Sequence, residues 1–305
     1  MTSGETSGRL PHEPVMSAQI IDYLRPEPGR TLVDATFGAG GHSRILLEAG
    51  ADVIAIDQDR EAVAHAAALE SSQLRFVAGN FRDIDKHLAE LGVDAVEGIL
   101  CDLGVSSMQL DQGERGFAFR QEGPLDMRMG SQEESAADVV NEYPQEELAA
   151  IIFRYGDERH SRRIARAIVA ARDEEAILTT ERLTKVVTSA YPPGYRREHP
   201  ARRTFQALRI FVNDELGALA QVLEIAPDVL VNGGRLAVLS YHSLEDRIVK
   251  HSFRDDPRLE PLTKRPLTAT EEELERNPRS RSAKLRVAQK SAQKIAQKKT
   301  EWGAA

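Results

Sequence analysis

The sequence predicts an α/β fold, a doubly wound parallel sheet of the Rossmann-like kind with a block of helices inserted into it. Short strand-like runs alternate with amphipathic helical stretches over residues 31–104, as in βαβ units. The first strand runs into a glycine-rich turn. The next convincing strand starts at residue 235, about 130 residues later, whereas a crossover needs on the order of a dozen to a few dozen residues.

The first part of the chain supplies four expected strands and the helices between them. Strands of a parallel sheet are covered on both faces, so they read as continuous apolar runs bounded by turns. The expected strands are 31–37, 52–57, 74–79 and 96–104, and the expected helices are 43–50, 60–70 and 84–91.

Residues 114–213 carry helical patterns and no strand-like alternation, with helices expected at 145–156, 161–175 and 180–191. Ligands of open α/β sheets bind outside the carboxyl ends of the strands, so we expect this subdomain to lie there and to recognise the substrate. The expected organisation is a disordered leader over 1–10, a discontinuous sheet domain of 11–113 plus 214–290, the inserted subdomain of 114–213, and a basic flexible tail over 291–305.

The sheet resumes after the inserted block. A long helix over 215–231 precedes a fifth strand over 235–242, which Asn232-Gly233-Gly234 introduces as a turn. Further elements are expected as a helix, a strand-like piece, a second helix and a last strand, at 244–253, 259–265, 270–276 and 283–289.

Composition excludes several classes of protein. Hydrophobic residues make up 41% and charged residues 29% of 305 residues, which is ordinary for a globular chain. The single cysteine, Cys101, excludes a disulfide framework and a thiolate zinc cluster, and no metal site is expected. Since no signal pattern and no membrane-length apolar run is present, we expect a cytoplasmic location and no membrane partner.

The net charge of −8 argues against a nucleic-acid partner, but the cations are clustered. One cluster has the i, i+3, i+4, i+7 spacing of a single helix face. A single cluster is typical of a solvated face, whereas three in an acidic chain leave an RNA or phosphate partner open. The clusters are Arg159, Arg162, Arg163 and Arg166; Arg196, Arg197, Arg202, Arg203 and Arg209; and eight Lys or Arg without an acid between Arg279 and Thr300.

The strongest local motif is the glycine-rich turn within residues 34–43, DATFGAGGHS. Glycines let a backbone approach a nucleotide-like ligand, and the following helix offers free N–H groups. Asp57, sixteen residues past Gly41, can accept both ribose hydroxyls of an adenosine. A dinucleotide fingerprint would need Gly or Ala where Ser43 stands, which favours S-adenosylmethionine. Asp34 can lie near a sulfonium or can brace the turn.

Two polar residues follow strands at the expected ligand edge. Asp102 ends the fourth strand, where amine-methylating enzymes hold a hydrogen-bond acceptor for the target amine, because the lone pair of cytosine N4 is delocalised into the ring. A turn or cap carboxylate is the alternative. His242 follows the fifth strand, where it can take a proton from the amine, bind phosphate, or cap the next helix.

Over nearly its whole length the chain resembles the bacterial 16S ribosomal RNA cytosine-N4 methyltransferase family (the RsmH or MraW family). The segments DLGVSS, GPLDMRM, RTFQALRI and HSLEDRIVK are distinctive of it. The matching segments, in order, are 12–16, 34–43, 102–111, 114–129, 155–169, 199–210, 233–250 and 277–288.

The resemblance implies a class I methyltransferase sheet with a helical insertion. It also implies S-adenosylmethionine-dependent N4-methylation of a cytidine in the decoding, or P-site, region of 16S rRNA within the small ribosomal subunit. The cofactor contacts that it implies are Gly40, Gly41, His42, Asp57, Phe81, Asp102 and Gln109.

One departure concerns how the target base is held. Many base-amine methyltransferases have Pro-Pro-aromatic after the polar residue, whereas Leu103-Gly104-Val105 follows Asp102 here. A stacking partner must then come from Phe117, Phe119 or Tyr241.

Two further functions remain as alternatives. A DNA or small-molecule amine methyltransferase could use the same fold, but the helical insertion and the basic tail argue against a small substrate. A non-catalytic RNA-binding module is the other; the intact glycine turn, Asp57 and Asp102 argue against it.

Overall fold

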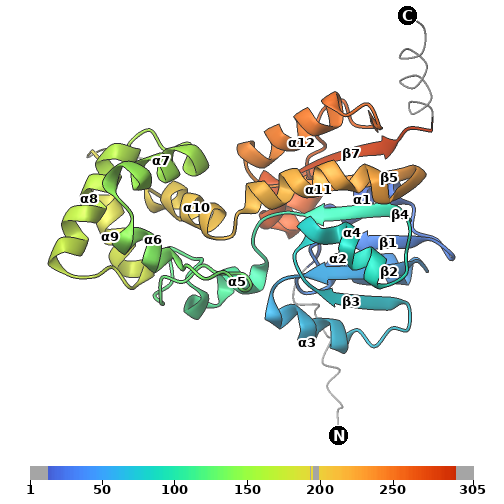
Figure 1. The fold of residues 1–305 in the computed structure, drawn as a ribbon, viewed down its shortest axis with the longest axis horizontal. Coiled ribbons are helices and arrows are strands. Elements are labelled where there is room, and N and C mark those ends of the chain that lie inside the picture. The colour runs from blue at the N-terminus through green and yellow to red at the C-terminus, as the bar shows by residue number, and fades with distance from the viewer. Residues whose placement is uncertain (1–12, 193, 195–198, 293–305) are drawn as a thin grey trace, which may run out of the picture.

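The computed structural model describes residues 13–192, 194 and 199–292, and its centre is a seven-stranded sheet (Figure 1). The strand order is β3-β2-β1-β4-β5-β7-β6. The first five strands pair in parallel, and β7 runs antiparallel to both β5 and β6. The predicted α/β fold with a parallel sheet is confirmed. The strands are β1 (Thr31–Asp34), β2 (Asp52–Asp57), β3 (Leu74–Ala78), β4 (Val96–Asp102), β5 (Leu230–Ser240), β6 (Leu259–Pro261) and β7 (Lys284–Lys290).

Helices cover both faces of the sheet because alternate strand residues point to opposite sides. Ile54 and Ile99 belong to a core shared with α4, α11 and α12, whereas Val53 and Leu100 belong to a core shared with α1 and α2. The helices outside the inserted stretch are α1 (Ser17–Leu24), α2 (Gly41–Glu48), α3 (Arg60–Ala68), α4 (Ile84–Glu90), α11 (Glu215–Val229), α12 (Ser243–Asp255) and α13 (Glu271–Arg276), with short 3-10 turns η1 (Phe81–Asp83) and η3 (Pro278–Ser282).

The stretch between β4 and α11 folds around a hydrophobic core of its own, beyond the carboxyl ends of the parallel strands (Figure 1). Its largest contacts join α7 to α8 and to α10. Helix α10 was not among the expected elements, although its buried Ala201, Phe205 and Leu208 repeat at helical spacing. The elements are α5 (Ser107–Asp111), η2 (Gly113–Arg115), α6 (Ala136–Glu142), α7 (Gln145–Gly156), α8 (Ser161–Glu174), α9 (Thr180–Ser189) and α10 (Ala201–Val212).

One buried side chain, Asn213, ties the end of the helical stretch, just before α11, to the segment between η2 and α6. Its Oδ1 accepts the Met129 N–H at 2.9 Å, and its Nδ2 donates to the Met127 and Arg209 carbonyls, each at 2.8 Å. Just beyond it, Arg209 forms a two-point ion pair with Glu215 at 2.7 and 2.8 Å. We call the three hydrogen bonds of Asn213 the Asn213 clasp.

The fifth strand differs from its prediction. It begins at Leu230, five residues before the expected start, and Asn232-Gly233-Gly234 lies inside it. Gly233 has φ +83°, and the pairing with β4 changes register between Val96 and Gly98, so the Asn-Gly-Gly sequence forms a bulge in a continuous strand. Most other predicted boundaries agree within two residues; the first strand, which ends at Asp34, and β6, which ends at Pro261, are shorter than expected. Within the described ranges no helix is long and apolar enough to cross a membrane.

Candidate functional site

A cavity of about 580 Å³ opens where β1, β2 and β4 end and the helical stretch begins. The strand order reverses between β1 and β4, the position at which open α/β sheets bind ligands. Most of the predicted cofactor residues line its wall: Gly41, His42, Asp57, Phe81, Asp102 and Gln109. Gly40 and His242, which were also predicted, are not part of the lining.

Gly40 lies outside the cavity lining and allows the tight turn before α2. It has φ +76° at the N-cap of α2, and a Cβ there would lie 2.8 Å from the Phe37 ring. A Cβ on Gly41 would lie 3.3 Å from Pro14, so there is little room for a side chain at this position of the cavity wall. Asp34 is fully buried and accepts hydrogen bonds from the Ser43 hydroxyl at 2.7 Å and the Thr36 N–H at 3.3 Å. Of its two predicted roles, the geometry therefore supports bracing the turn.

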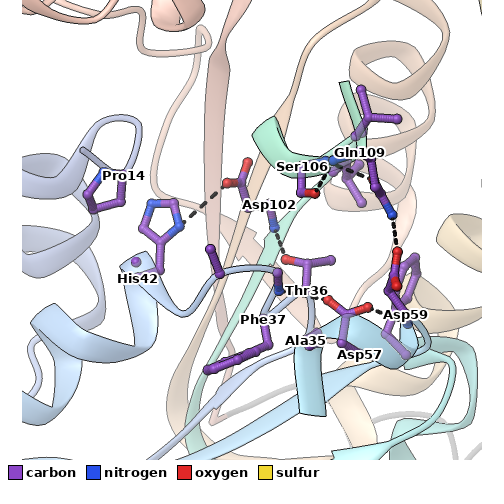
Figure 2. A pocket seen from close by; sticks show the side chains of 18 of the residues that line it. Pro14, Ala35, Thr36, Phe37, His42, Asp57, Asp59, Asp102, Ser106 and Gln109 are labelled. Carbon is purple, nitrogen blue, oxygen red and sulfur yellow. Dashed lines mark hydrogen bonds and ion pairs between the residues drawn. The ribbon is translucent and has the colours of Figure 1, made fainter. Parts of the chain in front are cut away.

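Asp57 lies at the end of β2 with its carboxylate facing the turn (Figure 2). Its oxygens accept the Gly38 N–H at 2.7 Å and the Asp59 N–H at 2.8 Å. Each oxygen keeps a further lone pair, which ribose hydroxyls can use. Burial raises the pKa of Asp57 to about 6, against the lowering effect of these two hydrogen bonds.

Asp102 lies at the end of β4 between two side chains. Its Oδ1 accepts the Tyr241 hydroxyl at 2.7 Å. Its Oδ2 lies 3.4 Å from Nδ1 of His42 (Figure 2). Its backbone N–H donates to the Thr36 hydroxyl at 2.7 Å. Burial raises the pKa of Asp102, which His42 and Tyr241 oppose, and burial together with Asp102 raises the pKa of Tyr241 well above 10.

Gln109 lines the cavity and is hydrogen-bonded to Asp59, another lining residue, which was absent from the predicted site. Its Nε2 donates to Asp59 Oδ2 at 2.7 Å (Figure 2). Arg115 donates to the same oxygen at 2.8 Å. Asp59 also caps α3, and an Asp just before a helix is a signal the sequence did contain. Its hydrogen bond with Arg115, 56 residues away, could not be predicted from any local sequence pattern.

The three candidates for stacking the base lie in different surroundings. Phe117 is 6% exposed inside the core of the helical stretch, and Phe119 stacks on His199 with ring centroids 4.7 Å apart. Neither lines the cavity, whereas Tyr241 does.

His242 occupies the capping position that was one of its predicted alternatives. Its Nδ1 accepts the Glu245 N–H at 3.4 Å, at the N-terminus of α12, and its Nε2 lies 3.2 Å from the Glu245 carboxylate. Glu245 completes a capping box. His242 is therefore separated from the cavity, and Tyr241 is the residue of this segment that faces Asp102.

The predicted basic clusters divide into exposed and inward-facing arginines. Arg159, Arg162, Arg163 and Arg166 are exposed at the start of α8 and along it, and no ion pair joins them to another described residue. Arg203 donates to the Asp157 carbonyl at 2.9 Å, and Arg202 also has an interaction partner. Arg196 and Arg197 lie outside the described residues.

Two basic residues correct the prediction of solvent-facing clusters. Arg209 is largely buried and paired with Glu215, because its side chain packs between α10 and α11. Arg286, in the basic run after Arg279, is 7% exposed and binds Asp246 at 2.7 Å. Positions beyond residue 292 fall outside the described chain.

Comparison with known proteins adds an independent line. Residues 9–291 match the model of the MraW methylase family. The chain is 55% identical over 285 residues to ribosomal RNA small subunit methyltransferase H of Deinococcus deserti, covering 93% of this chain and 95% of that protein. Proteins of the same name from Deinococcus radiodurans and Nostoc punctiforme are 54% and 51% identical, covering 92% of this chain and 90% and 94% of theirs.

Proposed function

The chain belongs to the MraW methylase family, and from that premise we propose that it methylates the N4 amine of a cytidine in the decoding (P-site) region of 16S ribosomal RNA. It is an S-adenosylmethionine-dependent methyltransferase of small-subunit ribosomal RNA. The observation that carries the finer proposal is Asp102, whose carboxylate lies at the end of β4, on the wall of the cavity at the ligand edge of the sheet.

The charges of the cavity fit the cofactor. When bound, S-adenosylmethionine supplies a methyl group on a positively charged sulfur. Carboxylates outnumber arginines in the lining, so the cavity favours a cation. The volume of about 580 Å³ lies within the range of small-molecule sites. The lining acids are Glu13, Glu48, Asp57, Asp59, Asp102, Glu215 and Glu245, and the lining arginines are Arg44 and Arg279.

Asp102 has the chemistry that amine methylation requires. The amine nitrogen forms a bond to the methyl carbon as the carbon–sulfur bond breaks, and the nitrogen then loses a proton. A carboxylate that accepts an N–H hydrogen bond increases electron density on nitrogen and offsets the positive charge that develops there. Gly41, Asp57, Phe81 and Gln109 line the rest of the cavity and are proposed to hold the cofactor.

The exposed arginines of α8 support an RNA substrate. Arg162, Arg163 and Arg166 lie on α8 and Arg159 lies just before it, and these four exposed cations, without ion-pair partners among the described residues, suit a phosphate backbone. We propose that the helical stretch binds RNA within the small subunit, and that the enzyme acts in the cytoplasm, where that subunit is assembled. DNA or a small amine as substrate is the competing proposal.

Analysis of modified nucleosides tests the proposed function. Small subunits from a strain lacking the enzyme are incubated with the full chain and isotope-labelled S-adenosylmethionine, then digested for mass spectrometry. We expect label in N4-methylcytidine, mapped to one position of the decoding region, and roughly 100-fold slower labelling by Asp102→Asn. Label on another nucleoside, or transfer to DNA or free amines but none to the subunit, would overturn the proposal.

A further inference from the structure

We propose that His42 and Tyr241 are positioning residues that keep Asp102 an anion and direct it toward the target amine, with His42 carrying the compensating proton. The inference rests on the proposed function in one respect, that Asp102 meets the amine. It assigns the charge state of the site, which the fold alone does not.

The hydrogen bonds of His42 fix the number of protons. Its Nε2 lies 2.9 Å from the Val15 carbonyl oxygen, and a carbonyl only accepts, so Nε2 carries a hydrogen. Its Nδ1 faces Oδ2 of Asp102 at 3.4 Å. A neutral imidazole would then present a lone pair to a carboxylate lone pair, which repel. One proton must therefore be shared between His42 and Asp102, either on the imidazole or on the acid.

Tyr241 selects between these two forms. Its hydroxyl donates to Oδ1 of Asp102 at 2.7 Å, which stabilises the charged carboxylate. The tyrosine is held in place because its backbone N–H donates to Glu245 at 2.8 Å, and its ring lies against Gly104, where a Cβ would be 3.4 Å away. Each carboxylate oxygen of Asp102 then faces one donor, Tyr241 at Oδ1 and His42 at Oδ2, and each keeps a second lone pair that can accept a hydrogen bond from the amine.

The other groups around Asp102 oppose its ionisation. Burial, Asp34 on β1 and Glu245 on α12 all raise its pKa, and only His42 and Tyr241 lower it. The neighbouring Cys101 thiol is neutral, because burial raises its pKa to about 12. Without the two positioning residues Asp102 takes up a proton and meets the amine with an O–H in place of a lone pair. Removal of either residue then changes the pH at which the enzyme works.

The first test is the pH profile of single-turnover methylation of small subunits, at saturating S-adenosylmethionine, between about pH 5.5 and 9. Tyr241→Phe removes the hydroxyl, and His42→Gln keeps a donor for the Val15 carbonyl while removing the shared proton. We expect the acid limb to move upward by about one pH unit, which lowers the rate ~10-fold on that limb and restores it toward wild type at high pH. Tyr143→Phe is the matched control, because its hydroxyl also binds a carboxylate, Glu134 at 2.9 Å, in the helical stretch.

A structural role gives a different result. It would lower the rate by the same factor at every pH, and that outcome, or an unchanged profile, overturns the inference. Cofactor affinity of Tyr241→Phe, measured by calorimetry, should stay within about threefold of wild type, because the hydroxyl is directed at Asp102.

A second readout needs no catalysis. In the full chain with ¹⁵N-labelled histidine, nuclear magnetic resonance reports the protons on His42. We expect both ring nitrogens of His42 to carry a hydrogen in the wild type, and only one of them in Asp102→Asn. A neutral His42 in the wild type overturns the inference. A protonated His42 that depends on Asp102, in a chain that methylates no cytidine, overturns the proposed function and leaves the proton-sharing pair standing.

Discussion

Asp57 shows how burial changes the working range of a carboxylate in this cavity. With its pKa raised to about 6, it is ionised at pH 7.5 and protonated at pH 5. Ribose hydroxyls donate to the ionised form, so binding is strongest above the pKa and weakens as pH falls through about 6. We expect the affinity for S-adenosylmethionine to fall by up to ~10-fold per pH unit below that value, measured by calorimetric titration at several pH values.

The control for this prediction is Asp57→Asn. The amide keeps one acceptor oxygen and the side-chain shape but does not titrate. Its affinity should be lower at pH 7.5 and should depend less on pH than that of the wild type. Since Asp102 titrates in the same cavity, only the difference between the two proteins belongs to Asp57. Parallel pH curves would assign the whole effect to another group.

At the residue scale, the side chains that follow strands could be predicted from the sequence, but the residues with which they form hydrogen bonds and ion pairs could not. Asp57 and Asp102 could be found because the strand pattern places both at one edge of the sheet. The hydrogen bond of Asp102 with Tyr241 joins residues 139 positions apart, and no local pattern reports such a pair. Arg209 was misassigned for a related reason: a charge in sequence does not tell whether its side chain meets water or a buried Glu215.

At the scale of elements, helix α8 carries the prediction about RNA. Replacing Arg159, Arg162, Arg163 and Arg166 with glutamine should weaken binding to 16S rRNA and flatten its salt dependence. For each phosphate that the protein no longer neutralises, the slope of log affinity against log salt decreases by about 0.7–0.9, so four such phosphates decrease it by roughly 3. Filter binding at several salt concentrations measures the slope.

Two exposed cations on α12 provide the comparison for α8. Arg247→Gln with Lys250→Gln removes positive charge from a helix that packs on the sheet. That variant should keep most of the wild-type slope, and both variants should bind S-adenosylmethionine normally. Equal slopes for the α8 variant and the wild type would show that its arginines are only solvated.

The elements themselves were largely predictable, and the exceptions have physical causes. Helix α7 and strand β2 follow the predicted ranges because their apolar periodicity is clear. In β5 the glycines resemble a turn, but the chain pairs with β4 before and after them, at Leu230 and from Arg235 onward, so they form a bulge within one strand. Helix α6 is seven residues long, too short for its periodicity to stand out.

At the scale of the molecule, the Asn213 clasp sets how the helical stretch meets the cavity. Asn213→Ala leaves the Met129 N–H and the Met127 carbonyl without their partner, and buried polar groups left unpaired cost about 1–3 kcal/mol. We expect the free energy of unfolding in urea to fall by about that amount. Single-turnover methylation should slow by more than cofactor binding weakens, since the residues on each side of the clasp shift relative to one another.

Asn141 provides a matched control because it makes a similar set of hydrogen bonds inside the helical stretch. Its Nδ2 donates to the Ala137 and Ile177 carbonyls at 2.8 and 2.9 Å, and its Oδ1 accepts the Ile177 N–H at 2.9 Å. Asn141→Ala should destabilise the protein to a similar extent and leave methylation of the remaining folded protein close to wild type. An equal decrease of activity in both variants would mean that the clasp acts only through stability.

The long gap between strands predicted an inserted stretch, but the sequence did not tell which part of the chain the end of that stretch binds. That depends on Asn213 reaching Met127 and Met129, more than 80 residues away. The division of the chain into a sheet domain and a substrate-recognition subdomain remains a prediction.

The neighbouring strands β4 and β5 are also synthesised at different times, because β5 lies much later in the chain than β4. About 130 residues separate Asp102 from Leu230, and a ribosome adding roughly 5–20 residues per second needs on the order of ten seconds to make them. During that interval β4 has β1 as a partner on one side and an open edge on the other, and open edges pair readily with other chains. The helical stretch, which has its own apolar core, emerges in the same interval but lies beyond the carboxyl ends of the strands, so the edge of β4 stays unpaired until β5 has been made.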